Sequence, residues 1–183
     1  MKVFGFAGYS GSGKTTMIEQ IIPRLVLEGV RVSLIKHAHH DFDIDRPGKD
    51  SYRHRQAGAT EVLVSSGSRW VLMHELRGAP EPSLTEQLAR FSPCDLVIVE
   101  GFKKEPYPKI EIHRRATGKP LLYPGDPSVV GIASNEALDT ALPQFGLEDY
   151  DAIAAFVLRH TGLGERSGDA PAAAHRKHIE VPT

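Results

Sequence analysis

A glycine-rich segment near the N-terminus constrains this 183-residue chain more than any other feature. Residues 8–15 read GYSGSGKT and match the pattern GxxxxGK(S/T). An apolar run over residues 2–7 precedes the segment, and apolar residues at helical spacing follow it over residues 17–26. A glycine-rich turn between a strand and a helix presents backbone N–H groups to an anion. The sequence therefore predicts a phosphate-binding loop, in preference to a chance glycine-rich turn.

The side chains of this loop carry distinct expected roles. Lys14 is expected to bridge the β- and γ-phosphates of a nucleotide, and the Thr15 hydroxyl is expected to bind Mg²⁺. The other loop positions expected to contact the nucleotide are Gly11, Ser12, Gly13 and Thr16.

A second element completes the predicted site. Residues 96–101 read LVIVEG, an apolar run typical of a strand buried on both faces of a parallel sheet. This strand delivers Glu100 to its carboxyl end, where open α/β sheets bind their ligands. Glu100 is expected to hold Mg²⁺, directly or through water, or to orient a hydrolytic water. The alternative is an acid that caps a helix or faces solvent. With the phosphate loop present, we take Lys14 and Glu100 as the candidate catalytic residues.

The order of elements predicts the fold class. Strands are expected at 2–7, 30–35, 61–65, 70–74, 96–99, 109–113 and 129–133, and helices at 17–26, 50–57, 83–91 and 147–159. This alternation predicts an α/β protein: a three-layer, P-loop NTPase-like domain with a mostly parallel sheet and an additional β-hairpin. We expect one nucleotide-binding domain over residues 1–163 and a disordered tail over residues 164–183, where Ser, Gly, Ala and Pro predominate.

Composition narrows the class of partners. The formal net charge is −1, which gives no electrostatic reason to expect nucleic acid or an anionic membrane as a partner. The single cysteine, Cys94, excludes an internal disulfide and fits a reducing compartment. No apolar run approaches the length of a membrane span, so we expect a soluble cytoplasmic protein.

Two further segments are candidates for the same site. Residues 36–45 read KHAHHDFDID and follow a predicted strand, so Lys36, His37 and His40 are expected near the nucleotide. A transition-metal site and a solvated polar loop are the alternatives. Asn135 ends another strand and is a candidate for reading the base. Its amide has one carbonyl acceptor and satisfies only part of the guanine edge, so the residues alone do not decide between GTP and ATP.

Several motifs together resemble the MobB family, the molybdopterin-guanine dinucleotide biosynthesis adaptor proteins. The matching stretches are GYSGSGKTT (8–16), LIKHAHHDFDID (34–45), PGKDSYR (47–53), AGA (57–59), RWVLMHE (69–75), DLVIVEGFK (95–103) and VGIASN (130–135). They run in order across residues 1–160, and the combination is far narrower than the phosphate loop alone.

The resemblance implies a GTP- and Mg²⁺-binding protein with weak GTPase activity at most. It also implies a homodimer that assists a MobA-type molybdenum cofactor guanylyltransferase, with molybdopterin as a further ligand. Carried over by position, residues 12–15 contact the phosphates, Thr15 and Glu100 bind Mg²⁺, and His37 and His40 lie near the nucleotide and pterin. The chain departs from the expected pattern at Asn135, where the family leads us to expect aspartate.

Two other functions fit parts of the pattern. A small-molecule P-loop kinase would use residues 37–55 as its acceptor site, with arginines from Arg53, Arg55, Arg114 and Arg115, although no lid segment is evident. A nickel or cobalt metallochaperone GTPase would use the histidines at 37, 39 and 40.

Overall fold

The computed structural model describes residues 1–38, 42–103 and 105–164. These residues form two compact units. The larger unit comprises residues 1–37 and 88–164, and the smaller one comprises residues 38–87. Each is described by itself. Except for Gly164, the predicted tail lies outside the described residues.

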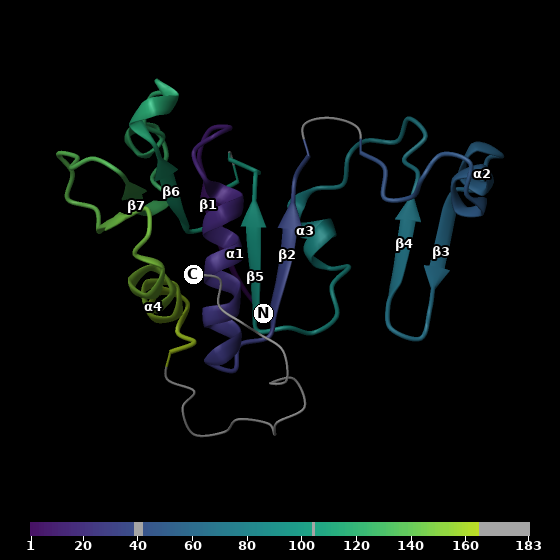
Figure 1. Cartoon of the computed structure of the whole chain (residues 1–183), viewed down its shortest axis with the longest axis horizontal. Coiled ribbons are helices and arrows are strands. Elements are labelled where there is room, and N and C mark those ends of the chain that lie inside the picture. Colours follow the sequence, from purple (N-terminus) through teal and green to yellow (C-terminus); the bar gives the residue numbers. More distant parts are fainter. Residues whose placement is uncertain (39–41, 104, 165–183) are drawn as a thin grey trace. The chain divides into compact units, whose positions relative to one another are not determined.

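A parallel sheet is the frame of the larger unit (Figure 1). Its order is β2-β5-β1-β6-β7-β8, and every neighbouring pair is parallel. The strands are β1 (Lys2–Ala7), β2 (Val32–Lys36), β5 (Leu96–Glu100), β6 (Lys109–His113), β7 (Val129–Ser134) and β8 (Gln144–Gly146). The chain runs from β1 to β2 on one side and later adds β6, β7 and β8 on the other, so β1 and β5 flank a topological switch point. Open α/β sheets bind ligands at the carboxyl edge of such a point.

Two helices of the larger unit, α1 (Lys14–Leu27) and α4 (Tyr150–Thr161), share one hydrophobic core with the central strands. The core includes the fully buried Phe4 and Phe6 of β1, and the Phe4 ring packs edge-on against Phe156 with centroids 6.4 Å apart. A 2.6 Å ion pair between Arg24 and Asp151 joins the two helices at the surface. All five residues of β5 are buried, so both faces of the sheet are covered at its centre.

The smaller unit contains α2 (Asp50–Gln56) and an antiparallel hairpin of β3 (Glu61–Ser65) and β4 (Trp70–His74). One guanidinium holds the unit together. Arg55, with a side chain 10% exposed, pairs with Asp43 at 2.7 Å, Asp45 at 2.6 Å and Glu75 at 2.6 Å. The hydrogen bonds from Arg55 hold the pKa of Asp45 below its usual value. Because this arginine is saturated by three structural carboxylates, it is not available as a catalytic cation.

The predicted α/β fold with a mostly parallel sheet and an additional hairpin is confirmed. Three short elements were not predicted: β8 and the 3₁₀ helices Arg115–Thr117 and Tyr123–Gly125. Each is only three residues long, too short to show a hydrophobic period. The helix expected over 83–91 is shorter, α3 (Leu84–Leu88). Helix α1 continues through Pro23, a residue type that often kinks or ends a helix.

Candidate functional site

The loop between β1 and α1 needs its glycines for steric reasons. A Cβ atom at Gly8 would lie 2.5 Å from the carbonyl oxygen of Ile112, so only glycine lets β1 leave the sheet this close to β6. Gly11 and Gly13 have φ values of 80° and 98°, in the left-handed region that L-residues rarely adopt. Gly13 is the N-cap of α1, and the loop therefore ends at a helix N-terminus, with the positive end of the helix dipole facing it.

Lys14 folds back over the loop. Its Nζ donates a 2.9 Å hydrogen bond to the Tyr9 carbonyl oxygen. Burial lowers the pKa of Lys14 and is the largest influence on it. The charge of Glu100 raises this pKa, whereas the charges of Lys103 and Lys36 lower it further. The ammonium thus sits among other cations at the loop, an environment that favours an anionic ligand.

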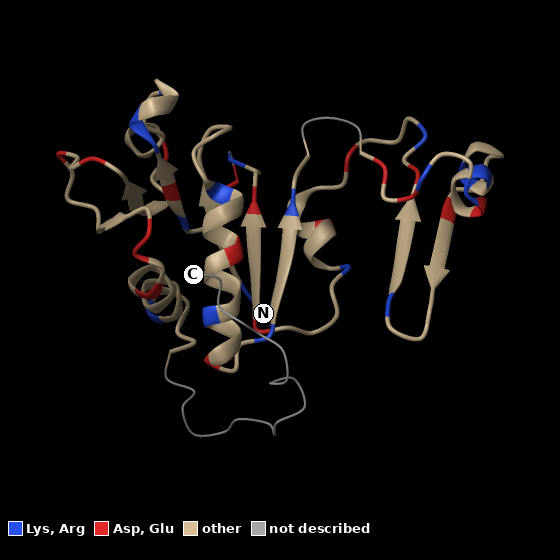
Figure 2. Cartoon of the chain, in the orientation of Figure 1, with Lys and Arg blue, Asp and Glu red and all other residues tan. Residues whose placement is uncertain are grey.

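Thr15 and Glu100 meet although they are 85 positions apart in the chain. The parallel pairing of β1 with β5 places Glu100 opposite Phe6, at the edge of the sheet from which the loop departs. The Thr15 Oγ1 donates to Glu100 Oε1 at 3.3 Å, and Lys36 Nζ lies 3.5 Å from Glu100 Oε2. Figure 2 shows this edge as the acidic end of β5 beside the basic end of β2. Glu100 is 7% exposed.

The Thr15–Glu100 pair fits a magnesium ion. Mg²⁺ takes oxygen ligands at 2.0–2.1 Å in an octahedron, so two adjacent ligands lie about 3 Å apart. The hydroxyl and carboxylate oxygens are 3.3 Å apart. Among the described residues, no group of three or more His, Cys, Asp and Glu side chains is placed to hold a metal. Mg²⁺ commonly uses one or two protein ligands together with phosphate and water.

Ser12 adds a hydroxyl that could bind a ligand in the loop. Its Oγ is buried, 2% of the residue is exposed, and the hydroxyl has no hydrogen-bond partner among the described residues. Leaving a buried hydroxyl unpaired costs about 1–3 kcal/mol. Because it lies in the loop predicted to hold phosphate, an oxygen of a bound anion would satisfy it.

The segment after β2 lies against the segment after β5. The His37 N–H donates to the Glu100 carbonyl oxygen at 2.9 Å, and its ring packs on Phe102 with centroids 4.8 Å apart. A Cβ at Gly101 would lie 2.8 Å from the His37 Cβ, so glycine is required for this approach. The structure thus brings Lys36 and His37 to the phosphate loop, whereas His40 lies outside the described residues.

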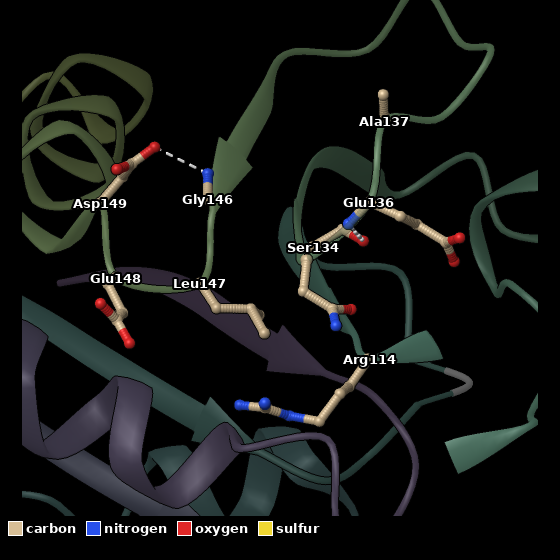
Figure 3. Close-up of a pocket in the computed structure, with 9 residues that line it drawn as sticks. Arg114, Ser134, Glu136, Ala137, Gly146, Leu147, Glu148 and Asp149 are labelled. Atoms are coloured by element: carbon tan, nitrogen blue, oxygen red, sulfur yellow. Dashed lines mark hydrogen bonds between the residues drawn. The ribbon is translucent and has the colours of Figure 1, made fainter. Parts of the chain in front are cut away.

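A pocket of about 520 Å³ opens beside the phosphate loop, at the carboxyl ends of β7 and β8 (Figure 3). Its lining consists of Arg114, Ser134, Asn135, Glu136, Ala137, Gly146, Leu147, Glu148 and Asp149. Arg114 lies between the pocket and the phosphate loop. It lines the pocket, and its Nη2 is 3.6 Å from where a Cβ on Gly13 would be. A ligand with phosphates on the loop therefore has a neighbouring hollow for its remaining part.

The polar groups of this pocket differ in their availability. Asn135 Oδ1 accepts the Arg115 N–H at 3.0 Å, so the carbonyl predicted to read the base is already used to hold a turn. Glu136 pairs with His113 at 3.1 Å, and Asp149 accepts the Gly146 N–H at 2.7 Å. Glu148 is exposed, and within the described chain its carboxylate has no hydrogen bond or ion pair.

Sequence reasoning did not assign Arg114 or Glu148 to the site. Glu148 comes just before the predicted last helix and carries no motif signal. It joins the pocket only because β8, an element too short to be predicted, pairs with β7. Arg114 follows β6 directly and was considered only for a kinase.

The sheet order and the glycine-rich loop at its switch point define a protein of the P-loop NTPase-like class. Residues 3–135 match the family described as molybdopterin guanine dinucleotide synthesis protein B, MobB. The chain belongs to this family.

Named relatives agree with this assignment. The chain is 41% identical over 158 residues to the molybdopterin-guanine dinucleotide biosynthesis adapter protein of Haemophilus influenzae, covering 85% of this chain and 86% of the relative. It is 41% identical over 159 residues to the protein of that name from Escherichia coli, covering 85% and 91%. Among solved structures, it resembles a MobB homologue from Bacillus stearothermophilus with a TM-score of 0.67 at 27% identity, covering 88% of this chain and 99% of that one. For the structure of Bacillus subtilis MobB, the TM-score is 0.68 at 26% identity, and the match covers 87% of this chain and 97% of that one.

Replacing Glu100 by glutamine tests the metal site. The amide keeps the size of the side chain but removes the charge, so the apparent Mg²⁺ affinity of the complex with a nucleoside triphosphate should fall by at least about tenfold. Binding of the nucleotide without Mg²⁺ should persist. Titrating Mg²⁺ into protein with a fluorescent nucleotide measures both quantities.

Glu19→Gln is the matched control, because Glu19 is an exposed acid of α1 in the same unit. If both variants kept the Mg²⁺ affinity of the unmodified chain, the assignment of Glu100 to the metal would be wrong.

Proposed function

We propose that this chain is a GTP- and Mg²⁺-binding adaptor in the biosynthesis of the molybdenum cofactor, acting in the cytoplasm. The observation that carries the proposal is the 3.3 Å approach of Thr15 to Glu100 beside a loop whose Ser12 hydroxyl is buried and unsatisfied within the described residues. Membership of the MobB family supports the role in cofactor biosynthesis. No helix among the described residues is long and apolar enough to cross a membrane.

The phosphate loop would hold the triphosphate through backbone N–H groups and Lys14. Thr15 and Glu100 would hold Mg²⁺, which neutralises the charge on the β- and γ-phosphates. Hydrolysis would be slow at most. Of the arginines considered for catalysis, Arg55 is saturated by carboxylates in the smaller unit and Arg114 lies towards the Gly13 end of the loop.

The pocket next to Gly13 supports guanine as the base. Guanine presents two donors, N1–H and N2–H, to a single acceptor group, whereas adenine has no donor at N1. A carboxylate is acceptor-only and pairs with both donors. Glu148 supplies such a carboxylate, and Arg114 lies across the pocket from it in Figure 3, where its planar guanidinium is suited to stacking on a base.

Nucleotide titration is the central test of binding. GTP should bind more tightly than ATP, and Lys14→Ala should abolish binding of both, because the cation that bridges the phosphates is lost. Glu148→Gln should reduce the preference for GTP over ATP by about tenfold or more, the value of a charge-assisted hydrogen bond. Fluorescent GTP, GDP and ATP report these affinities directly. Tighter binding of ATP than of GTP would remove guanine from the proposal.

The adaptor role requires a partner, which we propose to be the MobA-type guanylyltransferase that joins GMP to molybdopterin, with molybdopterin as a further ligand near His37. The relatives from Haemophilus influenzae and Escherichia coli are named adapter proteins of this biosynthesis. Immobilised chain should retain the purified transferase, with and without GTP tested in parallel. Failure to retain it in both conditions would contradict the adaptor role, while nucleotide binding would stand.

A homodimer would explain an exposed apolar face on the smaller unit. In the hairpin, Leu63 pairs with Leu72, and Trp70 lies on the same face two positions along. These side chains are 59%, 46% and 68% exposed. A contiguous exposed apolar patch of this kind marks a contact surface, and a two-stranded hairpin is only marginally stable alone. A two-fold axis would bury the same face of both copies.

Leu63→Ser tests this interface. It should raise the dissociation constant of the dimer by about tenfold or more, because it places a hydroxyl in the apolar contact. The control is Leu27→Ser, the same substitution at a leucine 58% exposed in the larger unit, which should leave the dimer intact. Analytical ultracentrifugation measures both. A monomeric unmodified chain, or equal effects of the two variants, would exclude this face as the interface.

A further inference from the structure

The short segment that follows β5, Gly101–Lys103, is held in place by two side chains from the start of β6. Tyr107 Oη donates to the carbonyl oxygens of Gly101 at 2.9 Å and Phe102 at 3.1 Å. Lys109 Nζ donates to the carbonyl oxygen of Lys103 at 3.0 Å. The structure therefore fixes the backbone from which the Lys103 side chain departs.

These anchors are themselves built into the core. The Lys109 side chain is fully buried, and its charge is paired with Asp126 at 2.9 Å. A Cβ on Gly5 would lie 2.1 Å from the Tyr107 ring, so glycine in β1 makes the space that the ring fills. Removing the Tyr107 hydroxyl would take away the buried hydrogen bond to the Gly101 carbonyl oxygen, which makes an accidental arrangement costly.

The segment also contains backbone strain. Phe102 has a φ of 41°, in the left-handed region that a non-glycine residue seldom adopts. Residues held in such conformations by well-packed surroundings cluster at active sites and ligand clamps. Together, the strain and the anchors indicate a segment that is pre-organised for a contact.

The Lys103 side chain lies against the phosphate loop. Its Nζ lies 4.5 Å from the centroid of the Tyr9 ring, and the Tyr9 carbonyl oxygen accepts the hydrogen bond from Lys14. Lys14 and Lys103 therefore meet at one residue of the loop, and Lys36 adds a third cation at the same edge of the sheet. Of these cations, Lys36 pairs with Glu100, and the other two bring charge that a polyanion would neutralise.

The position of Lys103 suits a contact with the terminal phosphate of a bound nucleotide. The nucleoside pocket adjoins Gly13, at the end of the loop that enters α1, whereas Lys103 adjoins Tyr9 at the opposite end. Lys103 also comes three residues after Glu100, and a magnesium ion there would bridge the β- and γ-phosphates. We propose that Lys103 is a ligand of the γ-phosphate, by which the chain distinguishes a nucleoside triphosphate from a diphosphate. This inference rests on the proposed nucleotide-binding function.

Lys103→Met tests the assignment, because methionine keeps a flexible unbranched side chain of nearly the same length and removes the charge. The affinity for GTP should fall by about tenfold or more, the affinity for GDP should stay within about twofold, and the ratio of the two should drop accordingly. Lys103→Arg should restore most of the ratio, since it returns a cation to the same place. Competition of GTP and GDP against a fluorescent nucleotide, with Mg²⁺ present, gives the affinities.

Lys119→Met is the matched control, because Lys119 is an exposed lysine of the same unit for which no side-chain contact is found in the described part of the chain. It should leave both affinities unchanged. A thermal melt without nucleotide separates folding from binding, since a purely structural Lys103 would lower the melting temperature and weaken GTP and GDP equally. Equal weakening of both nucleotides, or an unchanged ratio of the GTP and GDP affinities, would overturn the role of Lys103 but leave the proposed function standing. An unmodified chain that binds neither nucleotide would overturn the proposed function as well.

Discussion

The parallel pairing of β1 with β5 is the constraint on which the site depends. With Phe6 opposite Glu100, the strand that leads into the glycine-rich loop ends beside the strand that carries the acid. A shift of one residue would turn the Glu100 side chain to the other face of the sheet, away from Thr15. The register is held by the apolar residues of β5, which are buried on both faces, so the core of the protein also sets the geometry of the proposed phosphate and metal site.

The two ends of the site are supported by different parts of the sheet. On the side proposed for the γ-phosphate, Tyr107 and Lys109 hold the segment after β5 by hydrogen bonds to its backbone. On the side proposed for the nucleoside, Arg114 at the end of β6 reaches from Gly13 to the pocket beside β8. Both supports begin on or next to β6, which pairs directly with β1. One strand therefore supports both the proposed phosphate site and the proposed base pocket.

The two units have different surface chemistry. The larger unit contains the glycine-rich loop, the Thr15–Glu100 pair and the pocket, whose lining includes Arg114 and Glu148. The smaller unit is held by Arg55, whose side chain is largely covered, and its carboxylates, and its hairpin exposes Leu63, Trp70 and Leu72. This division would suit an adaptor, with the proposed ligand site in one unit and a surface suited to protein contacts in the other. Membership of the MobB family is consistent with both features.

The sequence by itself determined the fold class, the phosphate loop, the buried strand ending at Glu100 and the hairpin, because each is encoded by local periodicity or by a motif of adjacent residues. It also predicted Lys36 and His37 near the nucleotide, which stays a prediction; in the structure both residues contact Glu100. Only the tertiary structure decided that Asn135 is occupied by Arg115, that Lys109 is buried against Asp126, and that Glu148 lines a pocket with Arg114. These features depend on strand order and on contacts between distant residues, which no local pattern of apolar and polar side chains records.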